Sequence, residues 1–232
     1  MKLYVVLGLG QFGQHTAATL SAGGGEVLAI DRDERRVDVI KDQVSQAVCM
    51  DATDISALRA VGVAKAETAI VALGEEDLEA SILACAALSD LGVGYIVARG
   101  ANDLQGRILQ RVGASRILYP EREMGERLAR SLLVSGVLDQ VTLSTGQTVA
   151  QIEPNPEFVG KTLQECNLPA RFGIIVIGIQ KTRRSVDDRG EMHTELDLNS
   201  VPGPDEIINK DDVLVVVGNI AQIERLVQRH KS

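Results

Sequence analysis

The stretch YVVLGLGQFGQHTAATL, residues 4–20, decides the fold expected of this chain. Its apolar start predicts a buried strand over residues 3–7, and residues 11–22 predict a helix. Between them, Gly8 permits a tight turn, Gly10 lets the main chain approach a pyrophosphate, and Gly13 allows close packing of helix on sheet. The amides of the first helical turn then point at negative charge. The stretch therefore predicts a dinucleotide-binding loop, with a plain tight turn as the alternative.

The same alternation of strand and helix continues to about residue 120. Further strands are predicted over residues 26–30, 46–50, 68–73, 94–99 and 115–120, and helices over residues 33–41, 54–61, 77–91 and 103–112. The strands are continuous apolar runs, which is typical of a parallel sheet covered by helices on both faces. We therefore expect an α/β fold with a Rossmann-like, doubly wound parallel sheet.

The pattern changes after Pro120. Residues 121–138 predict one long amphipathic helix, with Met124, Leu128, Leu132 and Leu133 at helical spacing. Strands over 140–144 and 148–154 predict a hairpin around residues 145–146, and a short helix over 160–168, a strand over 173–182, a strand over 213–219 and a helix over 220–230 follow. Residues 183–206 are polar and predict a long loop or a loose hairpin. The expected domains are 1–120, a linking helix over 121–139, and a small α/β domain over 140–232.

An acidic residue closes the second predicted strand. Asp31 lies about 20 residues past the glycines, where a carboxylate can accept hydrogen bonds from both ribose hydroxyls and repel a 2′-phosphate. Arg32 follows at once and weakens that preference for an unphosphorylated ribose. The alternatives for Asp31 are a helix cap or a solvated acid, although Asp33 is the better cap for the helix over 34–41.

Ligands of such sheets bind beyond the carboxyl ends of the strands. The residues that follow the third, fourth and fifth strands are therefore candidates for nucleotide contact: Asp51, Ala52, Thr53, Leu73, Gly74 and Arg99. Thr53 or Asp54 could instead cap the next helix, and Arg99 could either meet a phosphate or remain solvated. Glu121 and Glu123 open the long helix, where acids favour the helix dipole; the alternative is a carboxylate that binds a metal ion at nucleotide phosphates.

Composition excludes several classes of protein. The formal net charge of −8 argues against broad binding to the phosphate backbone of nucleic acids. No secretory signal is recognisable, and the apolar runs are far shorter than the roughly 20 residues of a membrane span, so a cytoplasmic location is expected. The three cysteines show no metal-ligand spacing and are expected to be small apolar side chains.

No histidine is placed like a catalytic acid, and no Ser-His-Asp or Tyr-x-x-x-Lys pair appears at the predicted strand ends. His15 falls in the first helix, His193 in the polar segment and His230 near the end of the chain. A hydride-transfer enzyme needs a proton donor or acceptor beside its substrate. The sequence therefore favours a regulatory ligand-binding protein, with an NAD-dependent dehydrogenase whose substrate domain spans 140–232 as the alternative.

Several segments together resemble a known family. The glycine loop, VLAIDRDERRVD, AVCMDATD and GASRILYPEREMGERLARSLL are similar to regulator-of-potassium-conductance (RCK) proteins of the KtrA/TrkA type. The second half, with VGKTLQECNLPARFGIIVIGIQKT and INKDDVLVVVGNIAQIERL, resembles the matching C-terminal domain. The resemblance covers nearly the whole chain.

The resemblance implies a cytoplasmic subunit, peripheral to the inner face of the plasma membrane, that gates a membrane-embedded potassium translocating subunit of the KtrB/TrkH type. Such proteins form homodimers through the N-terminal domain, assemble into rings from tetramer to octamer, and bind ATP, ADP or NAD(H). Carried over by position, the predicted nucleotide-binding residues are Gly8, Leu9, Gly10, Gln11, Phe12, Gly13, Asp31, Arg32, Asp51, Ala52, Thr53, Leu73, Gly74, Arg99 and Glu121. Glu121 is also the predicted cation ligand, and Arg171 to Ile174 with Pro202 or Pro204 is a candidate region for cyclic di-AMP. Regulation of a different transporter is a further alternative.

One position departs from the KtrA pattern. KtrA-type proteins commonly read GLGRFG, and that arginine reaches the γ-phosphate of a neighbouring subunit's ATP. Gln11 stands there in this sequence, as in TrkA-type proteins, which favour NAD(H). A neutral amide forgoes a charge-assisted contact of about 1.5–3 kcal/mol, so the sequence favours NAD(H) over discrimination between ATP and ADP.

Overall fold

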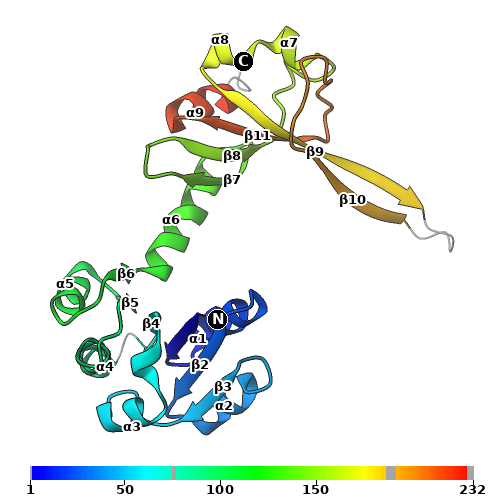
Figure 1. The fold of residues 1–232 in the computed structure, drawn as a ribbon. Helices are drawn as coiled ribbons and strands as arrows, with labels where there is room; N and C mark the ends of the chain where they lie inside the picture. The colour runs from blue at the N-terminus through cyan, green and yellow to red at the C-terminus, as the bar shows by residue number, and fades with distance from the viewer. Residues whose placement is uncertain (1, 75–76, 187–191, 229–232) are drawn as a thin grey trace. The chain divides into compact units, whose positions relative to one another are not determined.

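The computed structural model describes residues 2–74, 77–186 and 192–228. The chain divides into two compact units, Met1–Glu123 and Met124–Ser232. Figure 1 follows the chain through both units from the N-terminus to the C-terminus. Within the described part of the chain, no helix has the length and hydrophobicity needed to cross a membrane.

The first unit is built on a parallel six-stranded sheet. Its strands are β1 (Leu3–Leu7), β2 (Glu26–Asp31), β3 (Gln46–Cys49), β4 (Thr68–Val71), β5 (Tyr95–Arg99) and β6 (Arg116–Leu118). They lie side by side in the order β3-β2-β1-β4-β5-β6, and every adjacent pair is parallel. This confirms the predicted doubly wound sheet. The strand order reverses between β1 and β4, which is where such sheets open a crevice for ligands.

Helices cover both faces of this sheet, as the continuous apolar strands predict. They are α1 (Gln11–Ala22), α2 (Glu34–Ile40), α3 (Ile55–Ala60), a short 3₁₀ turn η1 (Val63–Lys65), α4 (Leu78–Asp90) and α5 (Asp103–Arg111). Val5 and Leu7 of β1 belong to one core, which side chains from α3, α4 and α5 complete. Val6 belongs to the core on the other face, together with side chains from α1 and α2. The alternation of side chains along β1 thus fixes both layers of helices.

The long helix is shorter than predicted. Helix α6 runs over Pro120–Leu133 and ends before residue 138, because Gly136 adopts a positive φ of 88° that a right-handed helix does not have. Strand β7 (Val137–Thr142) begins directly afterwards, three residues earlier than expected. The apolar positions that predicted the helix are exposed in this chain: Met124, Leu128, Leu132 and Leu133.

The second unit carries an antiparallel five-stranded sheet. Strand β7 is joined by β8 (Thr148–Ile152), β9 (Ile175–Val186), β10 (Met192–Asn199) and β11 (Val213–Gly218), in the order β10-β9-β11-β8-β7. Strands β7 and β8 form the predicted hairpin, and a turn from Leu143 to Gly146 connects them. The described part of this unit also contains α7 (Leu163–Cys166), α8 (Leu168–Phe172) and α9 (Ile220–Gln228). Side chains of α8, α9 and the inner face of the sheet form its core, in which Phe158 and Phe172 meet edge to face.

Residues 183–206, for which a long loop or a loose hairpin was expected, supply the last part of β9 and all of β10, and these two strands form a hairpin. Strands β9 and β10 pair antiparallel from Ile179 and Asn199 to Val186 and Met192. Strand β11 pairs with β9 only over Ile175–Gln180, so the two strands continue as a ribbon beyond the rest of the sheet (Figure 1). Residues 187–191 lie outside the described residues.

The cysteines are free thiols, and one departs from expectation. Cys85 and Cys166 are buried, and burial raises the pKa of the Cys85 thiol to about 12, as expected for a small apolar side chain. Cys49 is exposed at the end of β3, so its predicted burial is wrong. The strand ends at the sheet edge there, and the chain turns toward α3 instead of continuing through the core.

Candidate nucleotide-binding site

The glycine loop lies between β1 and α1. Gly8 has a positive φ of 93°, and its N–H donates to the carbonyl of Ile30 at 2.8 Å, which directs the chain out of the sheet. Gly10 is the N-cap of α1 and has no side chain to accept from the first-turn amides. A Cβ built on Gly10 would have no atom within 4 Å. The end of the helix is therefore open to a ligand, and its amides favour negative charge.

The other loop residues support the helix rather than the opening. A Cβ on Gly13 would lie 1.9 Å from the carbonyl oxygen of Gly8, so only glycine lets α1 come this close to the strand end. Leu9 is fully buried in the core that α1 and α2 cover, and Phe12 packs against that core. Gln11 is exposed at the first position of α1. The side chains of these three residues thus point to protein core or solvent.

A cavity of about 650 Å³ opens where the strands of the first sheet end. Predicted residues that line it are Gly8, Gly10, Asp31, Arg32, Asp51, Ala52, Thr53, Leu73, Gly74 and Arg99. The predicted residues Leu9, Gln11, Phe12, Gly13 and Glu121 are not part of its lining. Residues far apart in the sequence therefore meet here because parallel strands end at one edge of the sheet.

Five lining residues were not predicted: Asp33, Arg36, Ala72, Asp77 and Ala80. Asp33 caps α2 as expected, accepting from the Arg35 N–H at 3.0 Å, and Arg36 lies one helical turn further on. Likewise, Asp77 directly precedes α4, and Ala80 lies three residues further along that helix. The available signal is helical spacing: residues three apart in the first turn after a strand share a face, and that face borders the strand ends.

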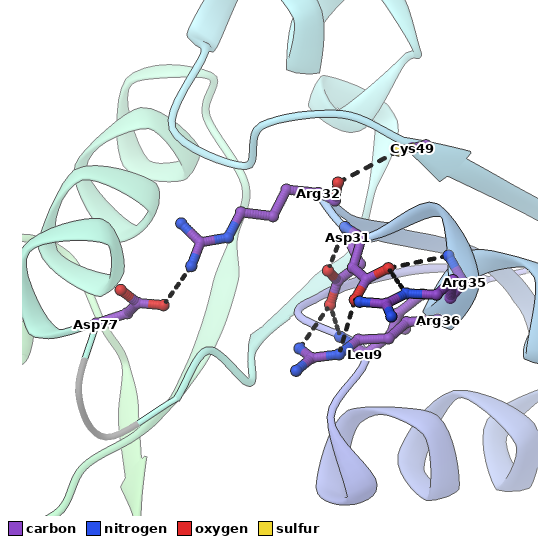
Figure 2. A network of polar contacts seen from close by, with 8 residues as sticks. Leu9, Asp31, Arg32, Arg35, Arg36, Cys49 and Asp77 are labelled. Carbon is purple, nitrogen blue, oxygen red and sulfur yellow. Dashed lines mark hydrogen bonds and ion pairs between the residues drawn. The ribbon is translucent and has the colours of Figure 1, made fainter.

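Asp31 ties the glycine loop to the second strand. The side chain is only 5% exposed, and its Oδ2 accepts from the Leu9 N–H at 2.6 Å (Figure 2). Its Oδ1 accepts from the Asp33 N–H at 2.8 Å, and the Arg36 guanidinium lies 3.5 Å from Oδ2. The carboxylate is thus neither a helix cap nor solvated. It holds the loop in place at the position where a ribose would lie.

Removal of this carboxylate is expected to destabilise the first unit. We expect Asp31→Ala to lower the free energy of unfolding by about 2 kcal/mol, because a buried charge-assisted hydrogen bond is lost and the Leu9 N–H keeps no acceptor. Urea unfolding followed by tyrosine fluorescence measures this unit alone, since all three tyrosines, Tyr4, Tyr95 and Tyr119, lie in it. Asp38→Ala is the control, because Asp38 forms only an exposed pair with Lys41. Equal stability of the two variants would contradict this role of Asp31.

Asp51 and Thr53 form a local turn at the end of β3. Asp51 Oδ1 accepts from the Thr53 N–H and from the Thr53 hydroxyl, both at 2.8 Å. The backbone hydrogen bond is the largest cause, and the hydroxyl the next, of a pKa of Asp51 below its ordinary value; the positive charge of Arg32 adds to it. Asp54, and not Thr53, caps α3 by accepting from Ser56 and Ala57. Asp51 therefore faces the cavity as a carboxylate at neutral pH.

Arg99 and Glu121 pair with each other. The Arg99 Nη2 atom lies 2.6 Å from Glu121 Oε1, and the Arg99 side chain is 18% exposed against 58% for Glu121. Arg99 thus lines the cavity as a held cation rather than a solvated one. Among the described residues, His, Cys, Asp and Glu form no group of three that could hold a metal ion. In the part of the chain that the structure describes, Glu121 is thus found with Arg99 and not in such a group.

The predicted second ligand region lies in the second unit. The Arg171 guanidinium pairs with Glu157 at 2.6 Å and lies over the rings of Phe158 and Phe172. Ile174 is fully buried. Pro204 lines a separate, open depression of about 530 Å³, where Lys181 and Glu206 form an ion pair.

His15 does not line the cavity, and His193 belongs to the second unit. His15 is exposed on α1, and His193 belongs to β10 and not to a loop. His230 lies outside the described residues. The cavity lining is instead acidic and guanidinium-rich, with Asp31, Asp33, Asp51 and Asp77 facing Arg32, Arg36 and Arg99.

Comparison with known proteins identifies the family. Residues 4–120 match the TrkA-N domain and residues 148–230 match the TrkA-C domain. The chain is 33% identical over 228 residues to the Ktr system potassium uptake protein C of Bacillus subtilis (strain 168), covering 98% of this chain and 97% of that protein. It is also 33% identical over 213 residues to the Ktr system potassium uptake protein A of Vibrio alginolyticus, covering 90% and 96%.

Solved structures share the fold. The GsuK channel superimposes with a TM-score of 0.66 at 20% identity, and the GsuK channel bound to NAD with a TM-score of 0.62 at 19% identity. Each match covers 97% of this chain but only 39% of the channel chain. The domain matches and the full-length similarity together show that this chain belongs to the family of TrkA-N/TrkA-C (RCK) proteins that includes the Ktr system potassium uptake proteins A and C.

Proposed function

We propose that this protein is a nucleotide-binding regulatory subunit of a potassium uptake system. It would act in the cytoplasm, at the inner face of the membrane, on a membrane-embedded translocating subunit of the KtrB/TrkH type. The names of its full-length relatives support the potassium system. The observation that carries the nucleotide is the open N-terminus of α1 beside a large cavity, where Gly10 leaves room for a phosphate.

The site residues fit the diphosphate group and the ribose of a nucleotide. Amides of the first turn of α1 would receive the phosphates, and Arg99 adds positive charge on the same cavity. Asp31 Oδ1 accepts from the Asp33 N–H, and because a carboxylate oxygen can accept two hydrogen bonds it keeps capacity for a ribose hydroxyl. The ligand would be NAD(H), or ATP or ADP. The neutral, exposed Gln11 supports NAD(H), because it offers no charge to a γ-phosphate.

The nucleotide would serve as a signal. A ligand that binds one conformation of the protein better than another shifts the population toward that conformation, and the membrane partner would respond to the shift. The proposal therefore needs no catalytic group.

Assembly and further ligands belong to the same proposal. Exposed apolar residues along α6, from Met124 to Leu133, support association with a second copy, since apolar stripes of this kind mark contact surfaces. Rings from tetramer to octamer would be built from such dimers. A cation at Glu121 would need to displace Arg99 and to gain ligands from the nucleotide or another subunit. A second ligand such as cyclic di-AMP would bind in the second unit.

Equilibrium binding tests the proposal. Titration calorimetry with ADP, ATP, NAD and NADH is expected to show saturable binding of at least one of them, and mass spectrometry of the nucleotide that copurifies would identify the preferred one. Absence of binding by all four would refute the proposal. Sustained NADH oxidation with a panel of small carbonyl compounds would favour a dehydrogenase instead.

A further inference from the structure

Arg32 reaches across the mouth of the cavity. It follows β2 directly, and its Nη2 atom lies 3.3 Å from Oδ2 of Asp77, which precedes α4 (Figure 2). Both residues line the cavity. In the sheet, β1 lies between β2 and β4. The ion pair therefore connects the segment that follows β2 to the segment that precedes α4, across the end of β1.

The Asp77 side chain pairs with Arg32 instead of capping helix α4. Asp77 occupies the N-cap position of α4, where aspartate ordinarily accepts from a first-turn amide, yet its side chain makes no such hydrogen bond. Asp54 and Asp33 at the corresponding positions of α3 and α2 do accept them. The Asp77 carboxylate is therefore directed at the guanidinium of Arg32.

The main chain at Arg32 is fixed as well. Its carbonyl oxygen lies 3.5 Å from the Cys49 Sγ, which donates to it (Figure 2), and the Met50 N–H donates to the Asp31 carbonyl at 3.0 Å. These contacts extend the pairing of β2 and β3 past the last ladder residues. The main chain at Arg32 is thus hydrogen-bonded, and its guanidinium pairs with Asp77. The Arg32 side chain is nevertheless 74% exposed.

Small apolar side chains also line the cavity. Ala52, which is 7% exposed, lies after β3, and Leu73 and Ala80 lie on the β4–α4 side. Because the phosphates belong at α1 and the ribose at Asp31, the base of a nucleotide falls beyond Asp31, toward the end of β3. The base would therefore lie between these apolar side chains and the guanidinium.

We propose that Arg32 is a specificity-determining residue that covers the purine base of the bound nucleotide by planar stacking. The inference rests on the proposed function, because it concerns the base end of the same site. A guanidinium is flat and stacks on aromatic faces, whereas an ammonium of the same charge does not. Asp77 holds the plane across the opening, so the stacking surface exists before the base arrives.

The test compares Arg32→Lys with the wild type and with Arg35→Lys. Lysine keeps the positive charge and removes the flat surface, so we expect ADP affinity to fall about fivefold, as the strength of a partly exposed cation–π contact implies. Arg35 lies in the next turn, is 90% exposed and does not line the cavity, so Arg35→Lys is expected to bind ADP as the wild type does. Titration calorimetry with ADP is the measurement, and unchanged melting temperatures would show that both variants fold.

The outcomes separate this inference from the function on which it rests. A wild type that binds none of ADP, ATP, NAD or NADH refutes the nucleotide site itself. A wild type that binds ADP with an Arg32→Lys variant of equal affinity overturns the stacking role alone. The charge of Arg32 could instead recognise a 2′-phosphate, and a comparison of NAD with NADP tests this role. If Arg32→Gln loses affinity only for NADP, Arg32 recognises the 2′-phosphate and not the base. An equal loss for both nucleotides supports the stack.

Discussion

A Gly13→Ala variant is expected to lose the fold of its first unit or to lose at least about 3 kcal/mol of its free energy of unfolding. The added Cβ would lie 1.9 Å from the carbonyl oxygen of Gly8 and 3.3 Å from the Cβ of Ala72. The first of these neighbours is backbone, which cannot rotate away as a side chain can. Relief requires α1 to move off the strand end, and that movement would open the core around Leu9 and Ala17.

Urea unfolding monitored by tyrosine fluorescence measures this effect in the first unit. Gly94→Ala is the control within the same unit, because Gly94 has no atom within 4 Å of its ideal Cβ and no positive φ. That substitution is expected to leave stability unchanged or to raise it by up to about 1 kcal/mol. A Gly13→Ala variant with wild-type stability would show that α1 does not need its close approach to the sheet.

A Gly10→Ala variant is expected to keep its stability and lose its ligand. Gly10 has φ −67° and ψ −177°, a conformation that alanine adopts without strain, and its Cβ would enter open space. That space is where the phosphates of a bound nucleotide would approach the main chain. We expect nucleotide affinity to fall about 100-fold, or about 2.8 kcal/mol, with an unchanged melting temperature.

Titration calorimetry of the nucleotide that binds the wild type most tightly, alongside thermal unfolding, measures both halves of this expectation. Gly94→Ala is the control, since Gly94 has equally open space but precedes β5 and does not line the cavity. Unchanged affinity of Gly10→Ala would place the phosphates elsewhere in the cavity. A lower melting temperature would mean that the open space at Gly10 belongs to the fold.

The two substitutions are expected to show that the two glycines of the loop have different roles. The same chemical change at positions three residues apart is expected to damage packing at Gly13 and recognition at Gly10. Sequence spacing alone predicts both glycines as one motif. The distances from each ideal Cβ to its neighbours separate them.

The sequence was sufficient for the architecture of the first unit because its signals are local. Apolar strands without alternation require cover on both faces, and glycines at a fixed spacing require a close turn into a helix. The sequence pattern does not locate the end of α6, because the helical pattern of Met124 to Leu133 continues weakly past the last turn, whereas the backbone conformation of Gly136 excludes further helix. The β9–β10 ribbon left two possibilities open, since polar strands beyond a sheet lack the apolar alternation that identifies strands.

What the sequence determined by itself was the family, the parallel sheet and the strand ends at which a ligand would bind, because each depends on residues close together along the chain. Only the tertiary structure decided the partners of the charged groups. It placed Asp31 on the Leu9 N–H, Glu121 on Arg99, and Arg32 across the cavity on Asp77. These contacts join residues 22 to 45 positions apart, and their geometry exists only once the strands lie side by side. The sequence predicted where a nucleotide would lie, and the fold determined which side chains are free to meet it.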